Sequence, residues 1–401
     1  MSSAAHALPV FDSPFALVAR RGRHVVTELR TPAKVLSTCS VNGGLRTDVR
    51  HLVNHQSCEP VKHQERFEVI TGLGPEGYHR SVCAELDLAP ASTAVMGTAA
   101  AMQYLGIATH TFADLAITAI VTGGVTGNAG SAGDPAHYDE ADGKWVRTAP
   151  ADAAAKPPGT HGGTINTLLL FSAPLSDTAL ARAVMTMTEA KTSALLELAV
   201  GSKSSWRLAT GTGTDQYAIA APASGTSART WTGKHTKAGE LIGRAVREAT
   251  LEALRWQNGL EPSYTRSLFH ALGRFGLKED DFKTQIARFL DAKQCQLLKD
   301  NWNPVIYEPQ SAAAAYAFAA VLDRTLAGTL SPATAREALI NQAALLAAGL
   351  AARPEDFPSL RTELVSALSV TLAPTPESLL PAAIELVTRA LALGWQRKWQ
   401  S

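Results

Sequence analysis

Two uninterrupted apolar runs constrain the fold of this chain more than any other feature. Residues 115–122 (LAITAIVT) and 164–171 (TINTLLLF) contain no charged residue and are rich in aliphatic and β-branched side chains. Runs of this length and composition are typical of strands that are buried on both faces. We therefore expect two central strands, with other parts of the chain covering both of their sides.

Glycine-rich segments adjoin these runs and two further expected strands. The segments are residues 123–134 (GGVTGNAGSAGD), Gly163, residues 209–215 (ATGTGTD) between expected strands at 206–210 and 217–221, and residues 42–44 (NGG) after an expected strand at 35–41. Such segments form tight turns, or they let the backbone approach a ligand closely. No GxxxxGK[ST] or complete GxGxxG pattern is present, which argues against a nucleotide cradle.

The remaining elements follow from periodicity and capping residues. They are strands at 15–20 and 24–29, a helix at 94–105, a helix capped by Ser176 that runs to about residue 200, and a helix capped by Thr236 that Gly259 ends. From Glu261 onward, alanine- and leucine-rich periodic runs are separated by prolines and predict helices. We therefore divide the chain into a core at 1–260 and a helical C-terminal region at 261–401.

The helix that begins at Ser176 carries a lysine on its apolar stripe. The stripe includes Leu180, Met187 and Leu195, and Lys191 occupies an intervening position at the helical repeat. A lysine there either extends its ammonium group to the water or pairs with an acid at a site. Glu189 points to nearly the opposite side of the same helix.

Composition excludes several classes of protein. The chain has 401 residues, is 46% hydrophobic and 18% charged, and has a net charge of +1. A near-neutral balance gives no support to a nucleic-acid or anionic-membrane partner. We expect no segment that spans a bilayer and no secretory signal at residues 1–10, so a cytoplasmic location is expected.

Neither the cysteines nor the histidines form a recognised metal-binding pattern. Four widely spaced cysteines without a CxxC pair are expected to be free thiols. His51, His55 and His63 lack a carboxylate or cysteine at zinc spacing, so we expect surface or loop histidines and no metal. The polar segment 135–162 is too long for a simple connector, and a lid over a ligand and a disordered segment are equally compatible with it.

An ordered series of motifs resembles the adenosylcobinamide amidohydrolase family. The series consists of residues 121–124 (VTGG), Asn128-Ala129, Gly133-Asp134, residues 163–166 (GTIN), Glu189-Ala190-Lys191, residues 209–215 and residues 233–240 (GKHTKAGE), with Asn42-Gly43-Gly44 and Asn54 upstream. The resemblance covers roughly residues 30 to 280. It implies hydrolysis of the amide that joins aminopropanol to a corrin propionate, which converts adenosylcobinamide to adenosylcobyric acid in cytoplasmic corrinoid salvage. The corrinoid is then the small-molecule partner, and its cobalt belongs to the substrate, so no cofactor is expected.

Amide hydrolysis needs a nucleophile, an oxyanion site and a proton for the leaving amine. Within the resemblance, Asp215, Glu240 or His235 is a candidate to activate water, Lys191 to stabilise charge or donate a proton, and Thr164 to act as a direct nucleophile. We expect these side chains to converge near Gly163-Thr164. The candidate substrate-binding residues are Asn42, Gly43, Gly44, Asn54, Asn128, Gly163, Asn166, Glu189, Thr210, Gly211, Thr212, Gly213 and Thr214.

A shorter resemblance bears on the fold. Gly-Gly-Thr-Ile before an apolar strand, then residues 173–175 (APL), a helix and a glycine-rich turn that ends in Asp215, is similar to aminopeptidases of the DmpA type. These have a four-layer αββα fold related to N-terminal-nucleophile hydrolases. We therefore expect an α+β core of layered sheets flanked by helices, with an all-helical C-terminal region. Two other functions stay open, a non-catalytic corrinoid-binding or delivery protein and a small-peptide amidase, and a homo-oligomer is compatible with each.

Overall fold

The structure is a computed structural model that describes residues 7–58, 63–136, 138–148, 163–368 and 375–399. The chain forms two compact units. The N-terminal unit comprises Met1–Ser204 and Ala209–Leu260, and the C-terminal unit comprises Ser205–Leu208 and Glu261–Ser401. Each unit has its own hydrophobic core.

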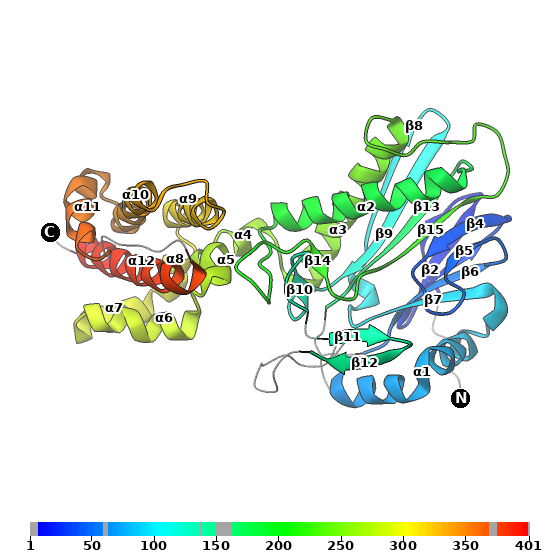
Figure 1. The fold of residues 1–401 in the computed structure, drawn as a ribbon, viewed down its shortest axis with the longest axis horizontal. Helices are drawn as coiled ribbons and strands as arrows, with labels where there is room; N and C mark the ends of the chain where they lie inside the picture. The colour runs from blue at the N-terminus through cyan, green and yellow to red at the C-terminus, as the bar shows by residue number, and fades with distance from the viewer. Residues whose placement is uncertain (1–6, 59–62, 137, 149–162, 369–374, 400–401) are drawn as a thin grey trace. The chain divides into compact units, whose positions relative to one another are not determined.

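Two sheets form the centre of the N-terminal unit (Figure 1). The first sheet has the order β1 (Leu8–Asp12), β2 (Ala16–Arg21), β3 (His24–Leu29), β6 (His51–Gln56) and β7 (Thr93–Thr98). The second has the order β5 (Gly44–Arg46), β4 (Ala33–Ser37), β15 (Gln216–Pro222), β13 (Ile165–Phe171), β9 (Leu115–Gly123) and β8 (Gly106–Phe112). Neighbouring strands are antiparallel, except that β6 and β7 are parallel and so are β13 and β15. Two short antiparallel pairs lie outside these sheets, β10 (Ala129–Gly130) with β14 (Gly211–Thr212) and β11 (Tyr138–Ala141) with β12 (Lys144–Arg147).

Helices cover the outer face of each sheet, which makes four layers in the order αββα. The side chains of β13 alternate, so Ile165 and Leu169 pack toward α2 (Asp177–Glu197) and α3 (Lys237–Asn258), while Leu168 and Leu170 pack toward the first sheet. Helix α1 (His63–Leu86) packs on the other face of the first sheet (Figure 1). The expected layered α+β fold is confirmed, and burial on both faces accounts for the uninterrupted apolar runs.

The predicted caps of the two long helices are confirmed. The Ser176 side chain accepts a hydrogen bond from the Ala179 amide, and the Thr236 side chain accepts one from the Gly239 amide. Gly259 ends α3 with a left-handed φ of 65°. These bonds satisfy amide groups that the first turn of a helix otherwise leaves unpaired.

The helix predicted at 94–105 is wrong. Residues 93–98 form β7, and a 3₁₀ turn follows at Met102–Tyr104. Ala94 and Met96 enter the core between the sheets, while Val95 packs beneath α1. Alanine and methionine favour helices, but parallel pairing with β6 and burial on both faces outweigh that preference here.

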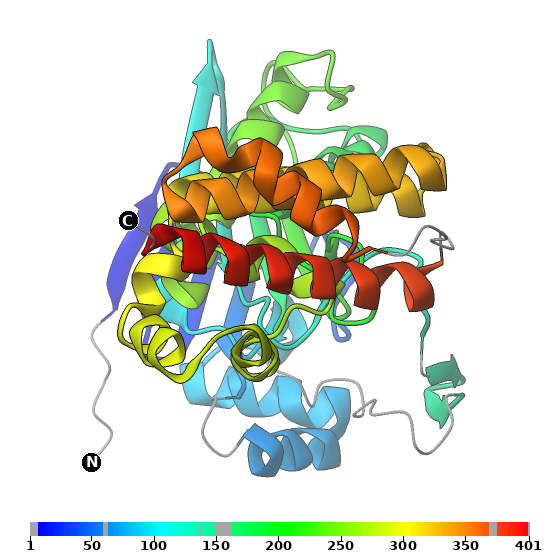
Figure 2. The ribbon, with the colours of Figure 1, turned by 90° about the vertical axis from the view of Figure 1, so that its left-hand side faces the viewer.

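The C-terminal unit is helical, as predicted. Its helices are α4 (Pro262–Thr265), α5 (Leu268–Leu272), α6 (Glu279–Ile286), α7 (Ala292–Asp300), α8 (Trp302–Ile306), α9 (Pro309–Leu326), α10 (Pro332–Ala351), α11 (Phe357–Val365) and α12 (Pro376–Lys398). Helix α10 packs against both α9 and α12 (Figure 2). The fully buried side chains of Phe282, Phe318 and Trp395 anchor this core.

The expectation that no segment is long and apolar enough to span a bilayer is wrong for one helix. Among the described residues, α12 passes that test by length and composition, and 61% of its apolar window is buried. Helices in the core of a unit have the same properties, so this is weak evidence for a membrane span. The four cysteines are free, as expected.

Close packing of α3 against β8 depends on Gly106. A Cβ atom at this position would lie 2.0 Å from the Ala249 carbonyl oxygen. We predict that Gly106→Ala lowers the free energy of unfolding by about 1–3 kcal/mol, because backbone must move to accommodate the methyl group. The control is Gly243→Ala in α3, where the added methyl group meets nothing within 4 Å. This variant should raise the free energy of unfolding by about 0.5–1 kcal/mol. Urea denaturation measures both, and equal midpoints for the two variants would contradict this account.

Candidate functional site

Three glycine-containing segments meet at one edge of the second sheet. Strand β9 runs antiparallel to β13, so the segment after Gly123 lies beside the one before Ile165. Strand β15 runs parallel to β13, so the turn before Gln216 lies at the same edge. This edge, with the segments 123–130, 163–164 and 211–215, is called the glycine edge below.

Asp215 and Lys191 form an ion pair on the helix-covered face of the glycine edge. The Asp215 carboxylate accepts hydrogen bonds from the Lys191 ammonium, the Ile165 amide at 2.9 Å, the Thr212 amide at 3.1 Å and the Thr212 hydroxyl. The two paired side chains are only 13% and 17% exposed. Four donors occupy about all the acceptor sites of a carboxylate, so Asp215 acts as an anchor for β13, the glycine turn and α2.

Gly211 makes this ion pair possible. A Cβ atom there would lie 2.6 Å from Asp215 Oδ2 and 2.8 Å from Lys191 Nζ. Of the two arrangements left open for Lys191, pairing with an acid is the one in the structure, and a neighbouring glycine leaves room for it.

Thr164 and Thr214 lie on the opposite face, toward the first sheet. Their Oγ1 atoms are 2.6 Å apart, and Thr164 Oγ1 donates to the Gly163 carbonyl oxygen at 2.8 Å. Asn128 Nδ2 donates to the same carbonyl oxygen and to Thr214 Oγ1, both at 3.2 Å. The side-chain alternation of a strand explains the division, because Thr164 and Thr214 each precede a residue that faces the helices.

A buried amide network lies behind Thr164 and connects the two sheets. Asn166 donates to Asn54 Oδ1 at 2.8 Å and to the Gly97 carbonyl oxygen at 3.2 Å, and Asn54 donates to Thr122 Oγ1 at 2.8 Å. Asn166 is fully buried, and its Oδ1 atom has no partner among the described residues. The contacts of Asn54 and Asn166, two predicted binding residues, are thus to other parts of the protein.

Hollows lie on both faces of the glycine edge. A cavity of about 540 Å³ on the Thr164 side is called the inter-sheet cavity, and its lining includes Gly97, Thr98, Gly163, Thr164, Thr214 and Gln216, with Ser57, Cys58 and Tyr78. A wider hollow of about 1240 Å³ on the other side is lined by Asn128, Asp134, Lys191, Lys203, Thr210 and Asp215 among others. Thr164 and the ion pair therefore face different spaces.

The expected convergence with Glu240 and His235 is not found. Glu240 is exposed and pairs with Lys237 at 2.7 Å, which lowers the pKa of its carboxyl. Lys237 lies over the Phe112 ring, at the β8–β9 turn, whereas Asn258 at the other end of α3 accepts a bond from Val125 at the glycine edge. Eighteen residues separate Glu240 from Asn258, which is about 27 Å of helix.

His235 and Glu189 also lie away from the ion pair. His235 is exposed and immediately precedes α3, at the end of that helix remote from the glycine edge. Glu189 pairs with Lys234 at 2.6 Å, and both side chains are more than half exposed. The motif at 233–240 therefore supplies a helix start, with Thr236 as its cap.

The remaining predicted binding residues shape the backbone around the site. Asn42, with a φ of 57°, donates to the carbonyl oxygens of Pro90 at 2.8 Å and Thr93 at 2.7 Å. A Cβ atom at Gly43 would lie 1.9 Å from the Cys39 carbonyl oxygen, whereas Gly44 has open space and a φ of 74°. Thr210 accepts a bond from the Ala132 amide at 2.9 Å, and Gly213 packs beside Asn128.

The segment predicted as a lid or a disordered segment contains a described hairpin, β11–β12, and its turn residue Gly143 lines the inter-sheet cavity. Residues 137 and 149–162 of that segment lie outside the described residues.

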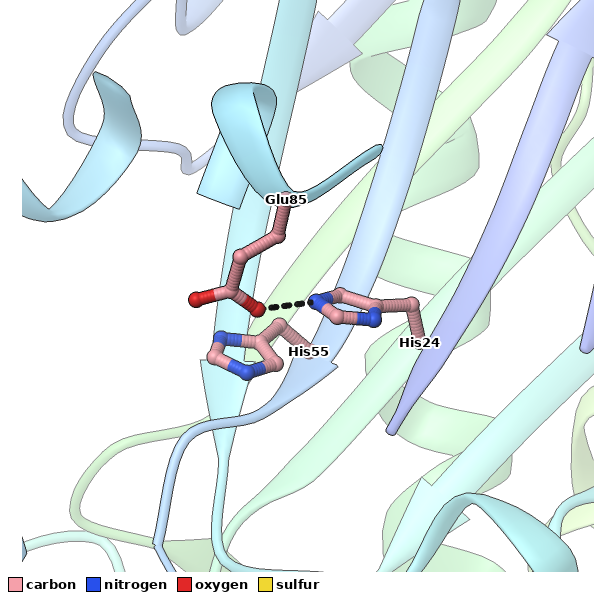
Figure 3. Close-up of side chains that lie close together, drawn as sticks. All are labelled: His24, His55 and Glu85. Carbon is pink, nitrogen blue, oxygen red and sulfur yellow. Dashed lines mark ion pairs between the residues drawn. The ribbon is translucent and has the colours of Figure 1, made fainter. Parts of the chain in front are cut away.

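A group of titratable side chains lies on the outer face of the first sheet (Figure 3). His24 and His55 are directly opposite each other on β3 and β6, and Glu85 of α1 reaches to 3.3 Å from His24 Nε2. Both histidines are buried, so the expectation of surface or loop histidines is wrong for His55. The Tyr78 hydroxyl is hydrogen-bonded to His55 Nδ1 at 2.8 Å.

The geometry of this group does not suit a metal ion. The two imidazole rings stack with centroids 4.5 Å apart and planes only 11° apart. Ring nitrogens bind metals along lone pairs in the ring plane, and lone pairs in stacked parallel planes do not meet at one point. The pair is instead a buried, neutral histidine stack, and burial lowers the pKa of His55 to about 3.

We predict that Asp215→Asn destabilises the N-terminal unit by about 2–3 kcal/mol, because it leaves Lys191 without its counter-charge and turns an amide donor toward other donors. Glu240→Gln is the matched control and should leave the melting temperature unchanged, since its ion pair is exposed. Differential scanning calorimetry measures both variants. Loss of activity in Asp215→Asn with an unchanged melting temperature would contradict the anchoring role.

Acid should destabilise the N-terminal unit through His55. Between pH 6.5 and about 3, the unfolded chain binds a proton at His55 that the folded chain does not bind. The contribution of neutral His55 to the free energy of unfolding is therefore complete above pH 6.5 and is lost as the pH falls toward 3. We predict that the free energy of unfolding of His55→Gln falls less over this pH range than that of the parent, by on the order of a few kcal/mol. Urea denaturation at each pH measures this free energy. The control is His235→Gln, at an exposed histidine, and identical pH slopes for the two variants would contradict the prediction.

Comparisons with known proteins agree with the motif series. The sequence model of the family adenosylcobinamide amidohydrolase matches residues 15–262. An uncharacterized protein of Methanocaldococcus jannaschii is 33% identical over 239 residues, which are 59% of this chain and 88% of that protein. The crystal structure of the PH0078 protein from Pyrococcus horikoshii OT3 aligns with 62% of this chain and 82% of its own, with a TM-score of 0.29 and 12% identity, values too low to assign a fold. The family match spans the whole glycine edge, and the chain belongs to the adenosylcobinamide amidohydrolase family.

Proposed function

We propose that this protein hydrolyses the amide between aminopropanol and the corrin propionate of adenosylcobinamide, which yields adenosylcobyric acid. Membership in the family supports an amidohydrolase. The observation that supports a reaction centre is the Thr164 hydroxyl, which lines the inter-sheet cavity beside groups that bind a carbonyl oxygen.

Thr164 is the proposed nucleophile. Its Oγ1 atom would attack the substrate amide carbon, the aminopropanol would leave with a proton, and water would hydrolyse the resulting ester. Asn128 Nδ2 and the Thr214 hydroxyl already donate to a carbonyl oxygen at 3.2 and 3.1 Å. Donors held in this way can stabilise the negative oxygen of a tetrahedral intermediate.

The ion pair of Lys191 and Asp215 would then be a positioning element. Asp215 holds the Ile165 amide, one residue after Thr164, and so fixes where β13 begins. This assignment differs from the expectation that Asp215, His235 or Glu240 activates water, because the donors around Asp215 leave it little free acceptor capacity. The cobalt enters only as part of the substrate, and we propose a cytoplasmic role in corrinoid salvage.

The proposal predicts two products from adenosylcobinamide, aminopropanol and adenosylcobyric acid, which mass spectrometry can detect. Thr164→Ala should lower kcat/KM by ~10³-fold or more, and Thr164→Ser should keep measurable turnover because it retains the hydroxyl. Glu240→Gln is the control and should retain the parental rate. Tight binding of cobinamide without cleavage would favour a corrinoid-binding protein, and cleavage of small peptides alone would favour the peptidase function.

A further inference from the structure

No acid, imidazole or amine among the side chains that the structure describes is hydrogen-bonded to the hydroxyl of the proposed nucleophile. Among the described residues, the Thr164 hydroxyl contacts only the Gly163 carbonyl oxygen and the Thr214 hydroxyl. Lys191 and Asp215 face the other side of the sheet and bind each other. A threonine hydroxyl is a weak nucleophile, and proteins activate it with an adjacent base, in some cases the amino group of the same residue at a chain N-terminus.

The peptide bond before Thr164 occupies the site that a substrate amide would need. The Gly163 carbonyl oxygen lies within hydrogen-bond distance of three side-chain donors, Thr164 at 2.8 Å, Thr214 at 3.1 Å and Asn128 at 3.2 Å. The two hydroxyl oxygens are 2.6 Å apart and share one proton, so Asn128 and one hydroxyl donate to the carbonyl at a time. Two donors on one carbonyl polarise it toward attack. Thr164 is also only 7% exposed, so this arrangement is largely shielded from solvent.

Only glycine fits at position 163. Its φ is 153°, and a Cβ atom would lie 2.9 Å from the Gly124 carbonyl oxygen and 3.3 Å from the Asn128 backbone nitrogen. The missing side chain lets this carbonyl oxygen point toward Asn128 and the two threonine hydroxyls. The Thr164 hydroxyl and the Gly163 carbonyl belong to one peptide unit, and holding reactants together in this way replaces a bimolecular encounter.

We propose that the chain cleaves itself between Gly163 and Thr164, an inference that rests on the proposed nucleophilic role of Thr164. The Thr164 oxygen bonds to the Gly163 carbonyl carbon, the carbon–nitrogen bond breaks, and the hydroxyl proton ends on the departing nitrogen. The result is an ester between Gly163 and the Thr164 side chain, with a free amino group on Thr164. Water then hydrolyses the ester, which leaves a carboxylate on Gly163 and restores the hydroxyl.

The cleavage resolves both features described above. The free amino group of Thr164, with an ordinary pKa of about 7.7–8.0, becomes the base for its own hydroxyl. The Gly163 carbonyl can leave the Asn128 and Thr214 donors, which are then available to a substrate carbonyl. The two products stay together, because β13 in the second product pairs with β9 in the first along its full length.

The test is the covalent state of the purified full chain. Intact-mass spectrometry and N-terminal sequencing should find two chains, residues 1–163 and 164–401, with the second beginning at Thr164. Thr164→Ala should remain a single chain of 401 residues with the circular dichroism of a folded protein. Thr164→Ser should still cleave, and Thr178→Ala, at an exposed threonine outside the site, should cleave as the parent does.

The outcomes separate this inference from the proposed function. A single 401-residue chain that hydrolyses adenosylcobinamide at full rate would overturn self-cleavage and leave the function intact. A chain cleaved before Thr164 that hydrolyses no corrinoid would support self-cleavage and overturn the function. Cleavage that persists in Thr164→Ala would identify a contaminating protease. The cleaved enzyme should also gain activity as the pH rises through about 8, the range in which an α-amino group loses its proton.

Discussion

The carboxylate of Asp215 is the interaction on which the glycine edge depends. It receives hydrogen bonds from β13, from its own turn and from α2, so one side chain joins three segments that are distant in sequence. Glycine-rich segments have many conformations available when unfolded, and ordering them costs conformational entropy. A buried, charge-assisted set of bonds is strong enough to offset part of that cost. Because the carboxylate points to the helices, the opposite face of the same turn is free to present Thr214 toward Thr164.

Local sequence patterns predicted the features that depend on neighbouring residues, such as buried strands and helix starts. Burial on both faces identified β9 and β13, and side-chain caps identified the starts of α2 and α3. Helical periodicity placed Lys191 on the inward face, where it meets Asp215. The position of Glu240 depended instead on which end of α3 meets the glycine edge, and periodicity carries no information about that direction. The stack of His24 and His55 depended on the register of β3 and β6, which is set by pairing between distant segments.

The two faces of the glycine edge carry different chemical groups. The helix side holds a saturated ion pair and gives the strands a fixed starting point. The side toward the first sheet holds neutral hydroxyl and amide groups, with the Asn54–Asn166 network beneath them. The acid candidate Asp215 and the proposed nucleophile Thr164 therefore lie on opposite faces of the glycine edge. The family match ends at residue 262, close to where the C-terminal unit, with a core of its own, begins.

The direction of the two covering helices has an electrostatic consequence. The last residues of α3 bind the segment after β9, and Thr192, near the end of α2, donates to the Thr210 carbonyl oxygen. Both helices therefore direct their carbonyl ends, the negative poles of their dipoles, toward the glycine edge. Glycine-rich loops that hold phosphate rely on the opposite pole, where free amide groups meet the anion. The dipoles of these two helices therefore do not assist an anion at the glycine edge as the helix of a phosphate loop does, although the two regions share a high glycine content.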